Sequence, residues 1–146
     1  MNASVTTLSS FRIVESVEVE ISPGDLIDKI TILEIKLDNI STPEKKNHVR
    51  HELDVLRLCR KKSIPDSVPL KRLSTDLKAV NRRLWTIEDE IREHERTQTF
   101  DDRFVTLARS VYQNNDKRAG LKAQINELFG ATMVEEKSYA DYGNGD

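Results

Sequence analysis

The sequence contains few of the residues that shape disulfide-rich or sheet-rich proteins. Its 146 residues include one cysteine (Cys59), five glycines and four prolines, and only 5% are aromatic. A single cysteine excludes an internal disulfide and a cysteine-rich zinc site. The charged fraction is 33%, against a typical share of about 25%. Few chain breakers and many charges together favour long helices with exposed polar faces.

Long apolar runs and a strong excess of one charge are also lacking. No stretch approaches the ~18 apolar residues that a membrane-spanning helix needs. The N-terminal residues have neither the basic opening nor the apolar core of a secretion signal. The formal net charge is −2, so no strongly basic surface predicts nucleic acid as a partner. We therefore expect a cytoplasmic protein that binds neither a membrane nor nucleic acid.

Four segments have the apolar spacing of amphipathic helices, at about residues 23–40, 43–60, 70–95 and 102–129. Ser22 followed by Pro23 indicates the start of the first helix, and Gly130 indicates the end of the last. In the third segment, apolar residues from Leu70 to Ile91 alternate in steps of three and four. This spacing predicts one continuous buried seam along that helix.

The last two predicted helices have similar lengths and a short connection, which is typical of an antiparallel hairpin. We therefore predict a mainly α fold, a bundle of about four helices that includes this long hairpin. Residues 16–21 alternate valine or isoleucine with glutamate, so at most a small β element is expected at the N-terminus, and another at the C-terminus. We expect one helical domain (16–139) between a loose N-terminal tail (1–15) and a frayed C-terminal tail (140–146).

The first predicted helix is apolar on two sides. Leu26, Ile30 and Leu33 form one stripe, and Ile32 and Ile35 point roughly the other way. Such a helix lies inside a bundle or is covered by a second subunit. We therefore expect the protein to be a homo-oligomer.

The last predicted helix places polar residues where its apolar stripe should continue. On a helical wheel, Arg118 falls near the middle of the apolar face, flanked by Asn115 and Lys122. A buried arginine without a partner is strongly destabilising, so Arg118 must pair with something. One interpretation is an internal ion pair with Glu88 or Glu34, which would fix the register of the helices.

The second interpretation is a cleft in which Arg118 and Lys122 bind a phosphate or carboxylate group, with Trp85 as one wall. The candidate ligand-binding residues are Lys29, Glu34, Asn81, Trp85, Glu88, Arg92, Asn115, Arg118 and Lys122. Gly120, in the same stretch, indicates that another backbone approaches closely. The sequence predicts no catalytic residue, no metal site and no cofactor.

Four strings in the sequence resemble a small family of helical proteins of bacteria and phages: ISPGDLIDKITILEIKLDNI, NRRLWTIEDEIR, ARSVYQNNDKRAGLKAQINEL and VEEKSY. The similarity runs from about Val19 to Tyr139. That family is a domain of unknown function, sometimes found beside glycosyltransferase or tetratricopeptide segments. The resemblance implies a helical fold and a role accessory to carbohydrate or surface-glycan metabolism, and it implies no established activity.

Two helical enzyme families have motifs that this sequence matches in part. All-α nucleotide pyrophosphatases hold magnesium with an ExxE pair and a following ExxD pair. Here Glu90 and Glu93 form the first pair, and no ExxD follows. Helical chorismate mutases bind a dicarboxylate with basic residues of long helices. The residues that could imitate that site are Lys29, Lys36, Arg118 and Lys122.

Because neither motif set is complete, we expect a non-catalytic binding or interaction protein. The alternative is a binder of small anions, or an enzyme, that uses a polar cleft around Arg118. The anion in that case would be a nucleotide, a sugar phosphate or a dicarboxylate.

Overall fold

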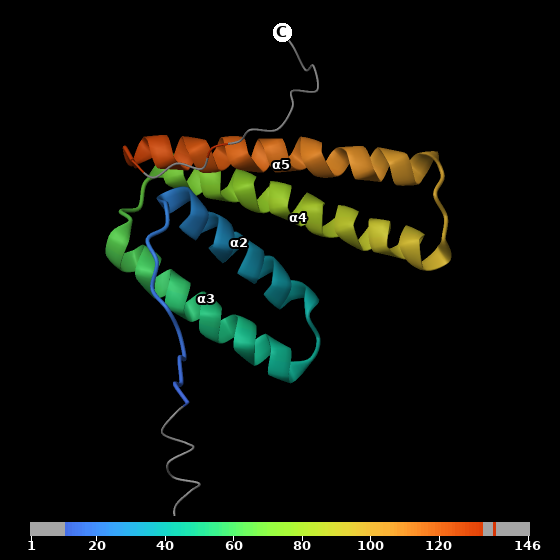
Figure 1. Ribbon diagram of the computed structural model, residues 1–146. Helices are drawn as coiled ribbons and strands as arrows, with labels where there is room; N and C mark the ends of the chain where they lie inside the picture. The colour runs from blue at the N-terminus through green and yellow to red at the C-terminus, as the bar shows by residue number, and fades with distance from the viewer. Residues whose placement is uncertain (1–10, 133–135, 137–146) are drawn as a thin grey trace, which may run out of the picture.

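The computed structural model describes residues 11–132 and 136 of the chain. This part contains four helices and no strand (Figure 1). The helices are α2 (Pro23–Asn39), α3 (Pro43–Ser63), α4 (Val68–Thr97) and α5 (Asp102–Leu128). The prediction of a mainly α bundle of about four helices is confirmed. Among the described residues, no helix combines the length and the apolar character that a membrane crossing requires.

Local hydrogen bonds explain where the helices begin and end. The Ser22 hydroxyl accepts a hydrogen bond from the Asp25 N–H at 3.1 Å, and Ser67 and Asp101 cap α4 and α5 in the same way. Each cap satisfies an N–H group that the first helical turn leaves free. After α4 the chain turns at Gln98, whose φ of 54° lies in the left-handed region.

The two longest helices, α4 and α5, form the predicted antiparallel hairpin, and α2 packs against both of them (Figure 1). α2 also packs against α3, which contacts no other described helix. α2 is therefore the central element of the fold. The hydrophobic core forms around α2. The most deeply buried side chains of this core come from all four helices: Ile27, Ile35, Leu53, Leu70, Leu77 and Ile125.

This arrangement explains within a single chain why α2 is apolar on two sides. Leu26, Ile30 and Leu33 of one stripe are buried, and so is Ile35 of the other. They are covered because α2 lies between α3 and the α4–α5 hairpin. The apolar faces of α2 therefore give no reason to expect a second subunit, and the oligomeric state remains a prediction.

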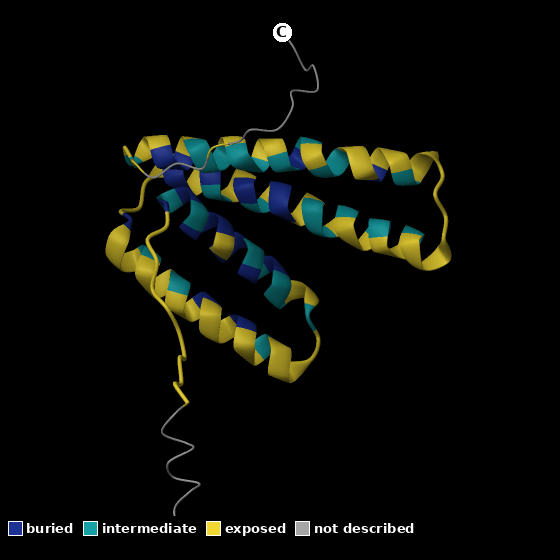
Figure 2. Cartoon of the chain, viewed as in Figure 1, coloured by how far each residue is buried: buried dark blue, intermediate teal, exposed yellow. Residues whose placement is uncertain are grey.

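The outer half of the hairpin projects beyond α2 and α3, and most of its surface is exposed or partly buried (Figure 2). Leu77, in the inner half of α4, has no exposed surface. Leu84, Ile87 and Ile91 are only partly buried. The predicted continuous seam is therefore wrong for the second half of α4, because there α5 is the main helix that covers it.

The predicted N-terminal strand is absent. Residues 16–21 are exposed, and they form neither a helix nor a strand paired with another described segment. Alternation of apolar and polar residues suits a strand, but a ladder also needs a second backbone to pair with. The predicted C-terminal strand and frayed tail lie outside the described residues, as do residues 1–10 of the predicted N-terminal tail.

Candidate functional site

Arg118 of α5 forms an ion pair with Asp28 of α2. Its Nε lies 2.9 Å from Asp28 Oδ1, and its Nη2 lies 2.5 Å from Asp28 Oδ2. The Asp28 side chain is 4% exposed and that of Arg118 is 31% exposed. Asp28 thus takes the place of the predicted partners Glu88 and Glu34. The interpretation that Arg118 is paired internally is correct, although it identified the wrong carboxylate.

Two further side chains complete a buried polar network around Asp28. Asn81 of α4 donates hydrogen bonds from Nδ2 to Asp28 Oδ1 and to Thr31 Oγ1, both at 2.9 Å. The Thr31 hydroxyl in turn donates to the Asp28 backbone carbonyl at 2.8 Å. The network joins α2, α4 and α5, so it fixes the relative positions of three helices.

A second set of contacts holds the N-terminus of α2 against α5. Lys122 Nζ lies 2.9 Å from Asp25 Oδ1, and the Gly24 N–H donates to Asn126 Oδ1 at 2.7 Å. A Cβ atom at Gly24 would lie only 2.5 Å from the Lys122 carbonyl oxygen. Gly24 is therefore the glycine that permits close approach of two backbones. The prediction for Gly120 was wrong, because a Cβ atom there would meet nothing within 4 Å.

Two other candidates also lie away from Arg118. Glu34 pairs with Arg57 of α3 at 3.1 Å and with Lys78 of α4 at 3.5 Å. Lys29 is exposed on α2. Of the predicted ligand-binding residues, Lys29, Glu34 and Lys122 therefore do not line the cavity that the other predicted residues share.

The remaining six candidates surround one cavity of about 490 Å³ between α2, α4 and α5. They are Asn81, Trp85, Glu88, Arg92, Asn115 and Arg118. Ile32 and Ile35 of α2, with Leu84 of α4, form apolar parts of the wall, and Asp89 adds a further carboxylate. Small-molecule sites have volumes of roughly 300–1,000 Å³ and combine apolar walls with a few polar groups. The cavity matches both descriptions.

Four polar side chains of this cavity make no hydrogen bond or ion pair within the described part of the chain. They are Glu88, Asp89, Arg92 and Asn115. By contrast, Arg57, Arg82 and Arg103, which lie elsewhere on the surface, are each paired with a carboxylate. The cavity therefore offers both donors and acceptors that are not committed to other groups, beside the partly buried indole of Trp85.

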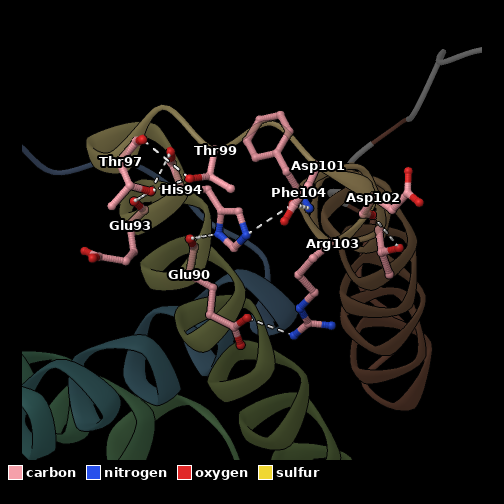
Figure 3. A network of polar contacts seen from close by, with 10 residues as sticks. Glu90, Glu93, His94, Thr97, Thr99, Asp101, Asp102, Arg103 and Phe104 are labelled. Atoms are coloured by element: carbon pink, nitrogen blue, oxygen red, sulfur yellow. Dashed lines mark hydrogen bonds and ion pairs between the residues drawn. The ribbon is translucent and has the colours of Figure 1, made fainter.

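The ExxE pair lies outside this cavity, at the tip of the hairpin (Figure 3). Glu90 pairs with Arg103 of α5 at 2.8 Å, and Glu93 pairs with Arg96. The hydrogen bond from Arg96 lowers the pKa of the exposed Glu93 carboxyl. His94 lies between the helices, with its Nδ1 2.9 Å from the Glu90 carbonyl oxygen. Each glutamate is thus paired with an arginine, and the Glu90–Arg103 pair joins α4 to α5.

No cluster of three or more metal-binding side chains occurs among the described residues. Asp28 was not one of the predicted partners of Arg118, and Ile32 and Asp89 were not among the predicted ligand-binding residues. A signal for Asp28 existed, because it interrupts the apolar run of Leu26, Ile27 and Ile30 in α2. The polarity of Asp28 could thus have been noticed, but its pairing with α5 depends on how the helices cross.

The comparisons with known proteins support the resemblance seen in the sequence. A family model described as "Family of unknown function (DUF6165)" matches residues 17–143. A search of curated proteins and a search of solved structures each found no match. Since the family model covers most of the chain, the protein belongs to this family of unknown function, DUF6165.

Proposed function

We propose that the protein acts by binding a small ligand, without catalysing a reaction, in the cavity between α2, α4 and α5. The observation that carries this proposal is the set of uncommitted polar side chains (Glu88, Asp89, Arg92 and Asn115) beside Trp85. Glu88, Asp89 and Arg92 are exposed and Asn115 is partly buried, so water solvates these groups in the absence of a ligand. Groups that are free around a partly apolar cavity are suited to pairing with a ligand.

The charges around the cavity indicate what kind of ligand fits. Arg118 faces the cavity, but the buried carboxylate of Asp28 offsets its charge. The uncommitted groups are then one guanidinium, Arg92, and two carboxylates, Glu88 and Asp89. A ligand with several negative charges would be repelled by those carboxylates. We therefore favour a neutral or zwitterionic molecule, with a flat apolar face for Trp85 and hydroxyl, amine or carboxylate groups for the rim.

A second hollow, of about 460 Å³, is a weaker candidate for a ligand site. It lies between other faces of α4 and α5, and its arginines include Arg82 and Arg103. These two are already paired, with Asp38 at 3.4 Å and with Glu90 at 2.8 Å. A ligand in this second hollow would have to displace those ion pairs. In the first cavity, Arg92 can bind a ligand without losing an existing contact.

A thermal-shift screen tests the proposal. The panel contains neutral sugars, amino acids, sugar nucleotides, nucleotides and dicarboxylates. A ligand present at about 100 times its dissociation constant stabilises the folded state by about 2.7 kcal/mol. We expect stabilisation by neutral or zwitterionic members, and we expect Arg92→Gln to weaken it. The matched control is Arg72→Gln, which changes an exposed arginine of α4 outside the cavity.

Two outcomes would contradict the proposal. Stabilisation only by multiply charged phosphates would contradict the ligand class. Stabilisation that Arg72→Gln and Arg92→Gln weaken equally would contradict the location of the site, because it would indicate a general effect of charge.

A further inference from the structure

The buried side-chain amide of Asn81 has one polar atom that no described residue satisfies. Asn81 is 6% exposed. Its Nδ2 donates one hydrogen to Asp28 Oδ1 and the other to Thr31 Oγ1, both at 2.9 Å. An amide nitrogen has only these two hydrogens to donate. The amide oxygen, Oδ1, accepts no hydrogen bond from any described residue.

The neighbours of Asn81 fix the orientation of its amide. The carboxylate of Asp28, which is paired with Arg118, can only accept hydrogen bonds, so it must face Nδ2 and not Oδ1. The Thr31 hydroxyl already donates to the Asp28 backbone carbonyl, so it too can only accept from Asn81. Both contacts hold Nδ2 against α2 and direct Oδ1 away from Asp28 and Thr31.

The Asn81 Oδ1 atom is open to the cavity between α2, α4 and α5. Among the described side chains, the oxygen that is both unpaired and fully enclosed is Oδ1 of Asn114. Oδ1 of Asn81 is unpaired but not fully enclosed, and Asn81 lines this cavity. A ligand that brings an O–H or N–H donor to this oxygen gains a hydrogen bond, whereas a ligand that displaces water without a donor loses affinity. Asn81 therefore selects for a donor at the inner end of the ligand.

The character of the cavity changes along α4, away from Asn81. Trp85, Glu88 and Arg92 follow at four, seven and eleven residues, which is about 6, 10 and 16 Å of helical rise. Trp85 is partly buried and shares its part of the wall with Ile35, while Glu88 and Arg92 are exposed. Side chains of a helix lean toward its N-terminus, so those of Glu88 and Arg92 lean back toward Asn81. The cavity thus has an acceptor inside, an aromatic wall in the middle and both charges at its mouth.

We propose that the ligand is an aromatic α-amino acid with a hydrogen-bond donor on its ring, such as tyrosine or tryptophan, an inference that rests on the proposed function. The donor of the ring binds Asn81 Oδ1, and the ring packs against the Trp85 indole. The ammonium group of the ligand pairs with Glu88 or Asp89, and its carboxylate pairs with Arg92. Each group of the ligand then meets a complementary group of the cavity.

Other classes of small molecule match fewer of these groups. A neutral sugar supplies donors but no charge for the mouth of the cavity. A nucleotide or a dicarboxylate brings negative charge that Glu88 and Asp89 repel. Phenylalanine has the ring and both charges, but it has no donor for Asn81 Oδ1. Phenylalanine is therefore the closest comparison for tyrosine, from which it differs by one hydroxyl group.

Isothermal titration calorimetry of the full chain with L-tyrosine and L-phenylalanine tests the inner end of the cavity. We expect the dissociation constant of phenylalanine to be at least about tenfold higher, because a site built to bind a donor rejects the analogue that lacks it. Tyramine, which lacks the carboxylate, tests the mouth. Arg92→Gln should weaken the binding of tyrosine by at least about fivefold and change that of tyramine by less than about twofold.

Asn81→Leu removes the acceptor and keeps a side chain of similar size. This variant should bind tyrosine and phenylalanine with dissociation constants within about twofold of each other. Because Asn81 also supports Asp28, circular dichroism must first show that the variant is folded. Asn115→Leu makes the same change at another asparagine of the cavity and should keep the preference for tyrosine. If Asn81→Leu does not fold, the comparison of the two amino acids on the wild type decides alone.

The outcomes separate this inference from the proposed function. Suppose that the wild type binds phenylalanine as tightly as tyrosine, or prefers a sugar, and that Arg92→Gln still weakens binding of a neutral or zwitterionic compound. The identity of the ligand is then wrong and the proposed function stands. A preference for tyrosine that a folded Asn81→Leu retains would overturn the role of Asn81. No binding by any compound of the thermal-shift panel would overturn both proposals.

Discussion

Replacing Arg118 with methionine should expose how much the fold depends on the buried ion pair. The change keeps most of the side-chain volume but removes the guanidinium. Asp28 then loses two of its three side-chain hydrogen bonds and keeps the one from Asn81. Removing one partner of a buried pair costs about 3–5 kcal/mol. Because the Arg118 side chain is 31% exposed, water can reach part of the vacated space, and we expect about 3 kcal/mol, at the lower end of that range.

Urea unfolding followed by circular dichroism measures this loss. The set comprises wild type, Arg118→Met, Asp28→Asn and the double variant. A neutral amide is easier to bury than an unpaired carboxylate. The stability loss of the double variant should therefore be smaller than the sum of the two single losses, by at least about 1 kcal/mol. Arg72→Met, at an exposed arginine of α4, is the control and should change stability by less than about 0.5 kcal/mol. A loss below about 1 kcal/mol for Arg118→Met, or strictly additive losses, would refute the structural role given to the pair.

Two further pairs of substitutions test the packing. Gly24→Ala should destabilise the fold by about 1–3 kcal/mol, because the new methyl group would overlap the Lys122 carbonyl. Gly120→Ala should stabilise the fold by about 0.5–1 kcal/mol, because no other atom lies near this position and alanine favours a helix. Urea unfolding curves that shift in the same direction for both would contradict this assignment. Leu77→Ala should cost about 2–5 kcal/mol, and Leu84→Ala less than about 2 kcal/mol because Leu84 is only partly buried. Equal losses would mean that the outer half of α4 is packed as tightly as the inner half.

Features that depend on local sequence were predictable. Ser22 and Pro23 indicated the start of α2 correctly, because a cap acts within one helical turn. Asn81, Trp85, Glu88 and Arg92 were predicted as ligand-binding residues, and their spacing of i, i+4, i+7 and i+11 places them on one flank of α4, where all four line the same cavity. Their common orientation follows from helical periodicity alone, so it did not require knowledge of the neighbouring helices.

Features that depend on how helices cross were not predictable. Asp28 and Arg118 are 90 residues apart in the sequence, and their contact requires α2 to cross α5 at one register. The same crossing makes Gly24, and not Gly120, the point of close approach. The seam of α4 was overextended for a related reason, since apolar spacing predicts a buried face but not how far the neighbouring helix reaches.

The alternation in residues 16–21 led to a different kind of error. It predicted a strand, whereas residues 16–21 form neither a helix nor a strand. It did not indicate a pairing partner, because the pattern of one strand carries no information about whether another backbone lies beside it.

The most direct test of the cavity as a ligand site is the fluorescence of Trp85, the only tryptophan in the chain. Because its indole forms part of the cavity wall, a ligand bound there must change its surroundings. Titration with the neutral or zwitterionic compounds that raise the melting temperature should give a saturable change in emission. The midpoint should move to higher concentration in Arg92→Gln and stay unchanged in Arg72→Gln. Thermal stabilisation without any change in Trp85 emission would place the ligand elsewhere and contradict the proposed function.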